Sequence, residues 1–361
     1  MLGISKIKSF YSRFESHIGV LALLFGFVFD NLTLRNATIN TQTTIFLIYL
    51  ALSVFAILML NTLDEREARG LEYKRLHFGS FILLQFTLGS LFSMFFVFYS
   101  RGVSISSSWP FLLLLFGNMI GSELFKQRYS KVSVQISLLF ISIFSFSIYF
   151  LPVVLHSIGD FVFILSGFVS LILVFLFTRA LARIARIRVA EDSRNIVVGV
   201  VAIYFLINIF YFLNIIPPVP LAMRDGGVYH SLVLIDGSYI VGGEEDSFWS
   251  FFSPYPVYHY SSGDAVYVVA AVYAPADLNT TIAHNWQYFD DKSARWQSST
   301  IIPVAIVGGR EAGYRSYSVK RNIAPGLWRV NIETVDGRVI GRVKFKIVED
   351  GASYILKQEE I

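Results

Sequence analysis

The sequence predicts a two-part chain: an α-helical polytopic membrane bundle of seven spans in residues 1–216, then an all-β antiparallel sandwich in residues 228–348. Apolar residues make up 54% of the 361 residues and charged residues 16%, whereas soluble domains average roughly 25% charged residues. Long apolar runs end near residue 216, and strand-like alternation of apolar and polar residues follows. Basic and nearly uncharged loops also alternate through the first part. These observations predict a membrane bundle that carries a β-domain.

Seven apolar runs approach the length of about 20 residues that a helix needs to cross a bilayer. The first run follows a basic segment, as in a secretory signal, but no cleavage site of small residues comes after it, so we expect an uncleaved span. The predicted spans are Ile18–Leu34, Thr43–Leu60, Phe78–Tyr99, Trp109–Phe125, Val132–Leu155, Phe161–Phe177 and Ile196–Ile216.

The loop charges predict the orientation of these spans, because cytoplasmic loops are enriched in Lys and Arg. From the N-terminal tail through each loop in turn, Lys and Arg number 3, 1, 4, 1, 3, 0 and 5. This alternation predicts a multi-pass protein of the cell (inner) membrane, with a cytoplasmic N-terminus and a periplasmic C-terminal domain. Arg179, Arg183 and Arg186 have helical spacing, so they either bind anionic lipid headgroups or serve as an orientation signal only. Membrane lipids are therefore an expected partner.

Composition and motifs argue against several functions. Residues 217–361 carry a net charge of −3, so no nucleic acid partner is expected. The chain has no cysteine, which excludes thiol nucleophiles and Cys-based metal sites. No phosphate loop or nucleophile elbow is present, and His230, His259 and His284 match no metal-ligand spacing. We therefore expect no cofactor, no metal and no enzymatic activity, and the oligomeric state stays open.

Polar residues inside predicted spans are few, and each is a candidate site residue because such residues are costly in a bilayer. They are Asp30, Asn118, Glu123 and Asn208. Asp30 and Glu123 lie near span ends, where water can solvate them. These four residues are the basis of an alternative function, a membrane enzyme or transporter that acts on a lipid-linked or small substrate in the helical bundle. A signalling receptor is a third option, although the inner loops are short.

The second part reads as short strands separated by turns. Residues 217–227 are expected to be a Pro-rich linker and residues 349–361 a charged tail. Asp336-Gly337 predicts a tight hairpin turn, with Trp328 before it and Phe345 after it facing the core. Such a run of strands favours an antiparallel sandwich. The expected strands are Val228–Ile235, Ala265–Tyr273, Thr281–Phe289, Thr300–Val307, Tyr314–Arg321, Leu327–Thr334 and Arg338–Val348.

Two groups of motifs stand out along the chain. The C-terminal motifs are His284-x-Trp286, Arg315-Ser316-Tyr317-Ser318-x-Lys320-Arg321, Pro325-Gly326-Leu327-Trp328-Arg329-Val330 and Asp336-Gly337-Arg338-Val339-Ile340-Gly341. The membrane-side motifs are Gly26-Phe27-Val28-Phe29-Asp30-Asn31-Leu32-Thr33-Leu34 and Ile216-Pro217-Pro218-Val219-Pro220-Leu221. Together they resemble a bacterial envelope family known as domain of unknown function 2914. The resemblance implies a C-terminal envelope domain behind a helical membrane part, and it implies no catalytic role.

One aromatic and basic cluster is the predicted ligand-binding site. His284 and Trp286 share a face of one strand, and Arg315 and Tyr317 share a face of another. If these faces adjoin, they form an aromatic surface edged with hydrogen-bond donors, which suits an envelope glycan, a peptide or a protein partner. The alternative is that Trp286 and Tyr317 fill the core. The leading hypothesis is therefore a non-catalytic membrane protein whose exported domain binds such a partner.

Overall fold

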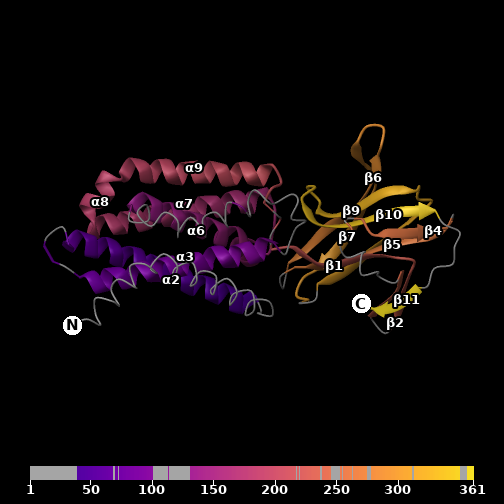
Figure 1. Cartoon of the computed structure of the whole chain (residues 1–361), viewed down its shortest axis with the longest axis horizontal. Helices are drawn as coiled ribbons and strands as arrows, with labels where there is room; N and C mark the ends of the chain where they lie inside the picture. Colours follow the sequence, from indigo (N-terminus) through magenta and orange to yellow (C-terminus); the bar gives the residue numbers. More distant parts are fainter. Residues whose placement is uncertain are drawn as a thin grey trace, which may run out of the picture. The chain divides into compact units, whose positions relative to one another are not determined.

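The computed structural model in Figure 1 describes two compact units, one helical up to Ile216 and one built from strands. The described residues are 39–67, 70–71, 73–100, 113, 131–216, 218, 220–235, 238–244, 253, 255–261, 263–274, 278–310, 313–349 and 356–361.

Among the described residues, the helical unit contains five helices that are long and apolar enough to cross a membrane. A short helix, α8 (Arg186–Glu191), connects the fourth and fifth of them. The five are α2 (Ile39–Glu67), α3 (Lys74–Ser100), α6 (Val132–Leu155), α7 (Asp160–Ile184) and α9 (Ser193–Phe212). They confirm five of the predicted spans and make a multi-pass membrane protein the natural interpretation.

The supported number of spans is therefore five, not the seven predicted from hydropathy. The two remaining predictions, Ile18–Leu34 and Trp109–Phe125, lie outside the described residues except for Leu113.

Helix α6 packs against both α2 and α7. Ring and hydrogen-bond contacts show that α2 and α6 are antiparallel. Near the start of α6, Gln135 Oε1 accepts a hydrogen bond from Asn61 Nδ2 near the end of α2 (2.7 Å). Near the other end of α6, the Tyr149 ring lies 5.8 Å from the Phe46 ring of α2. By contrast, α7 and α9 keep strongly exposed apolar faces, as expected for helices that contact lipid.

The strand unit forms three sheets (Figure 1). The first has the order β1-β5-β8, from β1 (Ala222–Tyr229), β5 (Ala265–Tyr273) and β8 (Tyr314–Arg321). The second has the order β4-β10-β9-β6-β7, from β4 (Val257–Tyr260), β10 (Val339–Glu349), β9 (Gly326–Thr334), β6 (Asn279–Asp290) and β7 (Arg295–Val307). The third has the order β11-β3-β2, from β11 (Leu356–Glu360), β3 (Ser238–Glu244) and β2 (Ser231–Ile235).

Three details differ from the expected antiparallel sandwich. Strand β4 pairs with β10 in parallel, so the five-stranded sheet is mixed. Strand β1 begins at Ala222, inside the stretch expected to be a linker. Strand β11, in the stretch expected to be a charged tail, pairs with β3 because its backbone groups complete the edge of that small sheet.

The predicted hairpin is confirmed between β9 and β10, where Phe345 lies opposite Trp328. Gly337 in the turn has a φ of 81°, a backbone conformation that favours glycine. Both aromatic side chains are buried, Trp328 at 5% exposure and Phe345 at 0%. One face of the five-stranded sheet thus forms the core, packed against the sheet of β1, β5 and β8.

Candidate functional site

The four residues predicted as a binding surface do not lie together on one surface. The side chains of His284 and Trp286 on β6 are each 0% exposed. They contact Ser316 and Ser318 of β8, which belongs to the opposing sheet. Both residues therefore fill the core, the role that the sequence left open for Trp286, and neither is available to a ligand in solvent.

A continuous chain of hydrogen bonds satisfies these buried polar side chains. Ser316 Oγ donates its hydrogen to the Ala270 carbonyl (3.1 Å), so His284 Nε2 must donate to Ser316 Oγ (2.9 Å). His284 Nδ1 then accepts from Ser318 Oγ (2.9 Å), which itself accepts from Trp286 Nε1 (3.0 Å). Burial lowers the pKa of His284 to about 4, so the neutral ring that this chain requires is the form present at pH 7.

Arg315 and Tyr317 lie on the opposite face of β8, because successive strand residues point to opposite sides. The Tyr317 side chain is 44% exposed, and its ring meets the Tyr239 ring at 5.9 Å. Arg315 lines a shallow hollow together with Asp225 and Tyr229. The prediction therefore chose the wrong face of β8. Ser316 and Ser318 point inward to His284 and Trp286, whereas Arg315 and Tyr317 point outward.

A different aromatic and basic cluster lies on the outer face of the five-stranded sheet. We call it the basic face, and it consists of Tyr255, Trp296, Arg329, Arg342 and Lys344. Arg329 on β9 lies directly opposite Lys344 on β10, and Arg342 is two positions along β10 from Lys344. Like charges directly opposite each other destabilise a strand pair, so this arrangement needs an explanation.

Amide side chains hold the two arginines in place. Arg329 Nε donates to Gln287 Oε1 (2.7 Å), and Arg342 Nε donates to Asn331 Oδ1 (3.1 Å). An amide oxygen orients a guanidinium group but leaves its charge uncompensated. Glu333 lies on the same face, where its Oε1 accepts a hydrogen bond from Asn285 Nδ2 (2.9 Å).

Two aromatic rings complete the basic face. The guanidinium carbon of Arg329 lies 4.3 Å from the centre of the Trp296 ring, and Lys344 Nζ lies 5.8 Å from the centre of the Tyr255 ring. The two rings stack at 6.2 Å with an interplanar angle of 15°. Such contacts hold a cation without neutralising it. In the described part of the chain, neither Arg329 nor Lys344 forms an ion pair.

The electrostatics of this face favour an anion. Burial lowers the pKa of Arg329 and of Lys344, and the nearby charge of Arg342 lowers both further. Burial raises the pKa of Glu333, so its environment disfavours the charge of this carboxylate. Oriented guanidinium and ammonium groups are the donors that bind carboxylate and phosphate oxygens in proteins. The basic face can therefore bind oxyanions, and no bond-breaking chemistry follows from it.

Residues 279–347 match the DUF2914 family, described as a protein of unknown function. This match confirms the resemblance for the C-terminal motifs, and it ends short of the membrane-side motifs. It covers β6 through most of β10, including the buried His284 chain and four of the five residues of the basic face.

No curated protein matches the chain. A β-glucosidase from Listeria innocua in complex with gluconolactone is 14% identical, with 30% of this chain and 16% of that chain covered and a TM-score of 0.19. The Pseudomonas fluorescens alkylpurine DNA glycosylase AlkC, bound to DNA containing an abasic site analog, is 10% identical, with 86% and 82% covered and a TM-score of 0.21. The chain thus spans about a sixth of the first of these proteins, and at these TM-scores neither likeness supports a fold or a function.

Asn208 is the predicted intramembrane candidate that the described residues include. Its Nδ2 donates to the Tyr204 carbonyl of its own helix (2.8 Å), a local bond that builds no site. Asp30, Asn118 and Glu123 lie outside the described residues.

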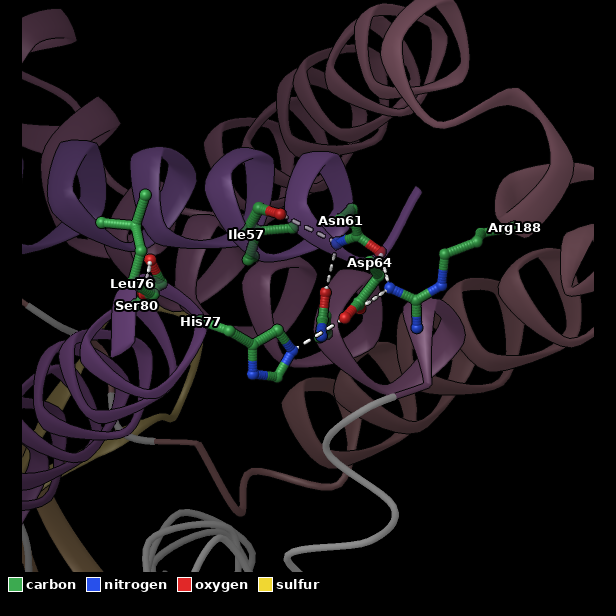
Figure 2. A network of polar contacts seen from close by, with 8 residues as sticks. Ile57, Asn61, Asp64, Leu76, His77, Ser80 and Arg188 are labelled. Carbon is green, nitrogen blue, oxygen red and sulfur yellow. Dashed lines mark hydrogen bonds and ion pairs between the residues drawn. The ribbon is translucent and has the colours of Figure 1, made fainter. Parts of the chain in front are cut away.

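A polar network that the sequence analysis missed ties together one end of the helical bundle (Figure 2). Figure 2 shows Asp64 near the end of α2 between His77 of α3 and Arg188 of α8. His77 Nε2 lies 2.7 Å from Asp64 Oδ1, and Arg188 pairs with Asp64 Oδ2 and donates to Asn61 Oδ1 (3.0 Å). Gln135 connects the start of α6 to the same network through Asn61. The network brings three loop regions to one end of the bundle.

The three histidines considered as metal ligands are separated in the structure. His284 is in the core, whereas His230 Nε2 (3.0 Å) and His259 Nδ1 (2.8 Å) each contact an oxygen of Glu244. Burial alone would raise the pKa of Glu244, but the hydrogen bonds from these two histidines lower it overall. Among the described residues, no group of three such side chains has the geometry to hold a metal ion.

The hairpin turn is the sequence signal that could have revealed the basic face. Residues at equal distances from the two-residue turn Asp336-Gly337 lie opposite each other, and this pairs Arg329 with Lys344. Trp296 and Tyr255 come from β7 and from the segment before β4, and the sequence carries no local signal that places them here.

Proposed function

We propose that the protein is a multi-pass membrane protein whose C-terminal β unit binds an anionic partner on the basic face, without catalysing a reaction. The observation that carries this proposal is the pair of opposed cations, Arg329 and Lys344. One is oriented by an amide and an indole ring, and the other lies over a phenol ring. A bound anion would offset the repulsion that the fold leaves between them.

The helical unit serves as the membrane attachment, with lipids as its partner. The network around Asp64 joins helix ends next to the three loops with 4, 3 and 5 basic residues. The rule that basic loops stay inside then supports a cytoplasmic location for this end. Helix α9 begins at this end, where Asp192 accepts a hydrogen bond from the Ser133 amide. Helix α9 runs from this end towards the other side of the membrane, and the β unit follows its C-terminal end. This direction supports an extracytoplasmic location of the β unit in a cell envelope.

The alternative function, an enzyme or transporter within the bundle, has weaker support. In the part of the bundle that the structure describes, ionisable and amide side chains connect helices at the helix ends, around Asp64 and between Asp160 and Tyr211. Nearer mid-helix the connected side chains are hydroxyls, Ser53 with Thr87 and Ser147 with Ser170. The position of the ionisable and amide groups suits helix-end packing better than a substrate site at mid-membrane.

Chromatography on dextran sulfate tests anion binding by the basic face. The full chain in a non-ionic detergent is loaded at low salt and eluted with a salt gradient. A variant with Arg329→Gln and Lys344→Met should elute at lower salt than the wild type, because screened charge pairs weaken with ionic strength.

The control removes two exposed lysines away from the basic face, Lys292→Gln with Lys357→Gln, and so has the same net charge. Control and test variants that elute together would refute the proposal, since retention would then depend on total charge alone.

A further inference from the structure

We propose that the anionic partner is an acidic polysaccharide, bound along the basic face with successive charged sugar units on Arg342, Lys344 and Arg329. This inference rests on the proposed function and names its ligand class. The distinguishing features are the location of the cations on the flat face of the sheet, their spacing, and the donors that the fold leaves unused.

The location of the basic face disfavours an extended peptide. Peptides that bind to sheets usually add to an edge strand, where their main chain pairs with unpaired backbone groups. Strand β9 is paired with both β10 and β6, and β10 is paired with β9 along most of its length and with β4 over Lys346–Glu349. The cations project from the flat face of these strands and not along a sheet edge. A peptide on this face would find no backbone ladder to join. A sugar chain has no amide backbone, so it needs no strand edge to pair with.

The spacing of the cations fits a repeating anion. Arg329 and Lys344 are opposite each other across adjacent strands, a separation of about 5 Å between their Cβ atoms. Arg342 and Lys344 are two residues apart on one strand, or about 7 Å. These distances are comparable with the length of one sugar unit in a chain, so an acidic group on each unit can meet a cation.

The donors on this face suit sugars as well as charges. Arg329 uses its Nε on Gln287 and the face of its guanidinium on Trp296. Among the described residues this leaves its terminal nitrogens as a fork for a carboxylate or phosphate. The Nε2 group of Gln287 is a further donor of the kind that hydroxyl oxygens accept. The half-buried rings of Trp296 and Tyr255 lie beside these donors and offer contact to the apolar face of a sugar ring.

The test compares ligands that differ in one property at a time. The full chain in phosphatidylcholine nanodiscs is titrated calorimetrically with oligogalacturonate, which has one carboxylate on each sugar. Its methyl ester is the uncharged match, oligoglutamate of equal charge is the acidic peptide, and inorganic phosphate is the isolated anion. We expect oligogalacturonate to bind more tightly than the other three, and Lys344→Met to weaken it about tenfold, as for the loss of one charged hydrogen bond.

Lys346→Gln is the matched control, because Lys346 is an exposed lysine on the same strand and the same face. Tryptophan fluorescence melting of each variant separates lost binding from lost folding. Equal binding of the ester, tighter binding of oligoglutamate or phosphate, no binding of oligogalacturonate, or an equal loss in Lys346→Gln would each overturn the inference. If oligoglutamate or phosphate binds best and Lys344→Met still weakens it, the ligand class is wrong but anion binding stands. If neither Lys344→Met nor Arg329→Gln changes the binding of any anion, both proposals fail.

Discussion

Acidification from pH 7 to pH 5 should destabilise the β unit by about 2 kcal/mol through His284 alone. In the unfolded chain this ring has its ordinary pKa of 6.5, whereas burial holds the folded pKa at about 4. Between these values the unfolded state binds a proton that the folded state does not, so stability decreases as the pH falls. The whole difference is worth about 3.4 kcal/mol, and somewhat more than half of it is lost by pH 5.

Urea denaturation of the full chain in a non-ionic detergent measures this effect. Tryptophan fluorescence reports mainly on the β unit, because four of the five tryptophans follow residue 217. His284→Gln removes the titrating ring and should flatten the dependence of the unfolding free energy on pH by about 2 kcal/mol between pH 7 and pH 5. The carboxylates contribute equally to both proteins, so the difference isolates His284. Equal slopes for the two proteins would refute the assigned hydrogen-bond chain.

Four other changes have clear expected outcomes. Trp328→Ala should lower the unfolding free energy of the β unit by about 3–5 kcal/mol, and an unchanged urea midpoint would contradict its inward position. Lys344→Met should stabilise the ligand-free protein by a few tenths of a kcal/mol in the same assay, since it removes a like-charge contact; destabilisation would mean that Lys344 supports the fold. Arg188→Met should cost the helical unit about 2 kcal/mol in thermal melting followed by circular dichroism, whereas the exposed Arg186→Met should not. In this cysteine-free chain, a membrane-impermeant thiol reagent should label Ser231→Cys from the outer side and Ser193→Cys from the inner side only, and the reverse pattern would overturn the topology.

Hydropathy predicted the described helices because the bilayer imposes one simple demand, a long apolar run with its backbone satisfied internally. The same reasoning could not find the network around Asp64, since Asn61, His77, Gln135 and Arg188 come from four different helices. Strand periodicity located β5, β8, β9 and β10 for a similarly local reason. It missed β11 because a run such as Leu356–Glu360 is polar, and only the unpaired edge of β3 makes it a strand.

The predicted binding site failed for a reason that is physical and local to β8. Alternation tells which residues share a face, but it does not tell which face turns inward. By apolarity, Tyr317 would be chosen for the core over Ser316 and Ser318. The core, however, already contains the polar ring atoms of His284 and Trp286, and a buried polar atom without a partner is costly. The serines supply those partners, so the serine face turns inward and Tyr317 turns outward.

The same argument explains why the basic face went unnoticed and why it points to a ligand. On β9 and β10 the residues that alternate with the core are polar, and an isolated strand pattern assigns them to solvent. Tertiary structure instead places Arg329 against an amide and an indole, where its orientation is set and no described carboxylate forms an ion pair with it. In the core, the polar ring atoms of His284 and Trp286 form hydrogen bonds with serine side chains of the same unit. On this face Arg329 and Lys344 form no ion pair with a described residue, and a bound anion would supply that partner.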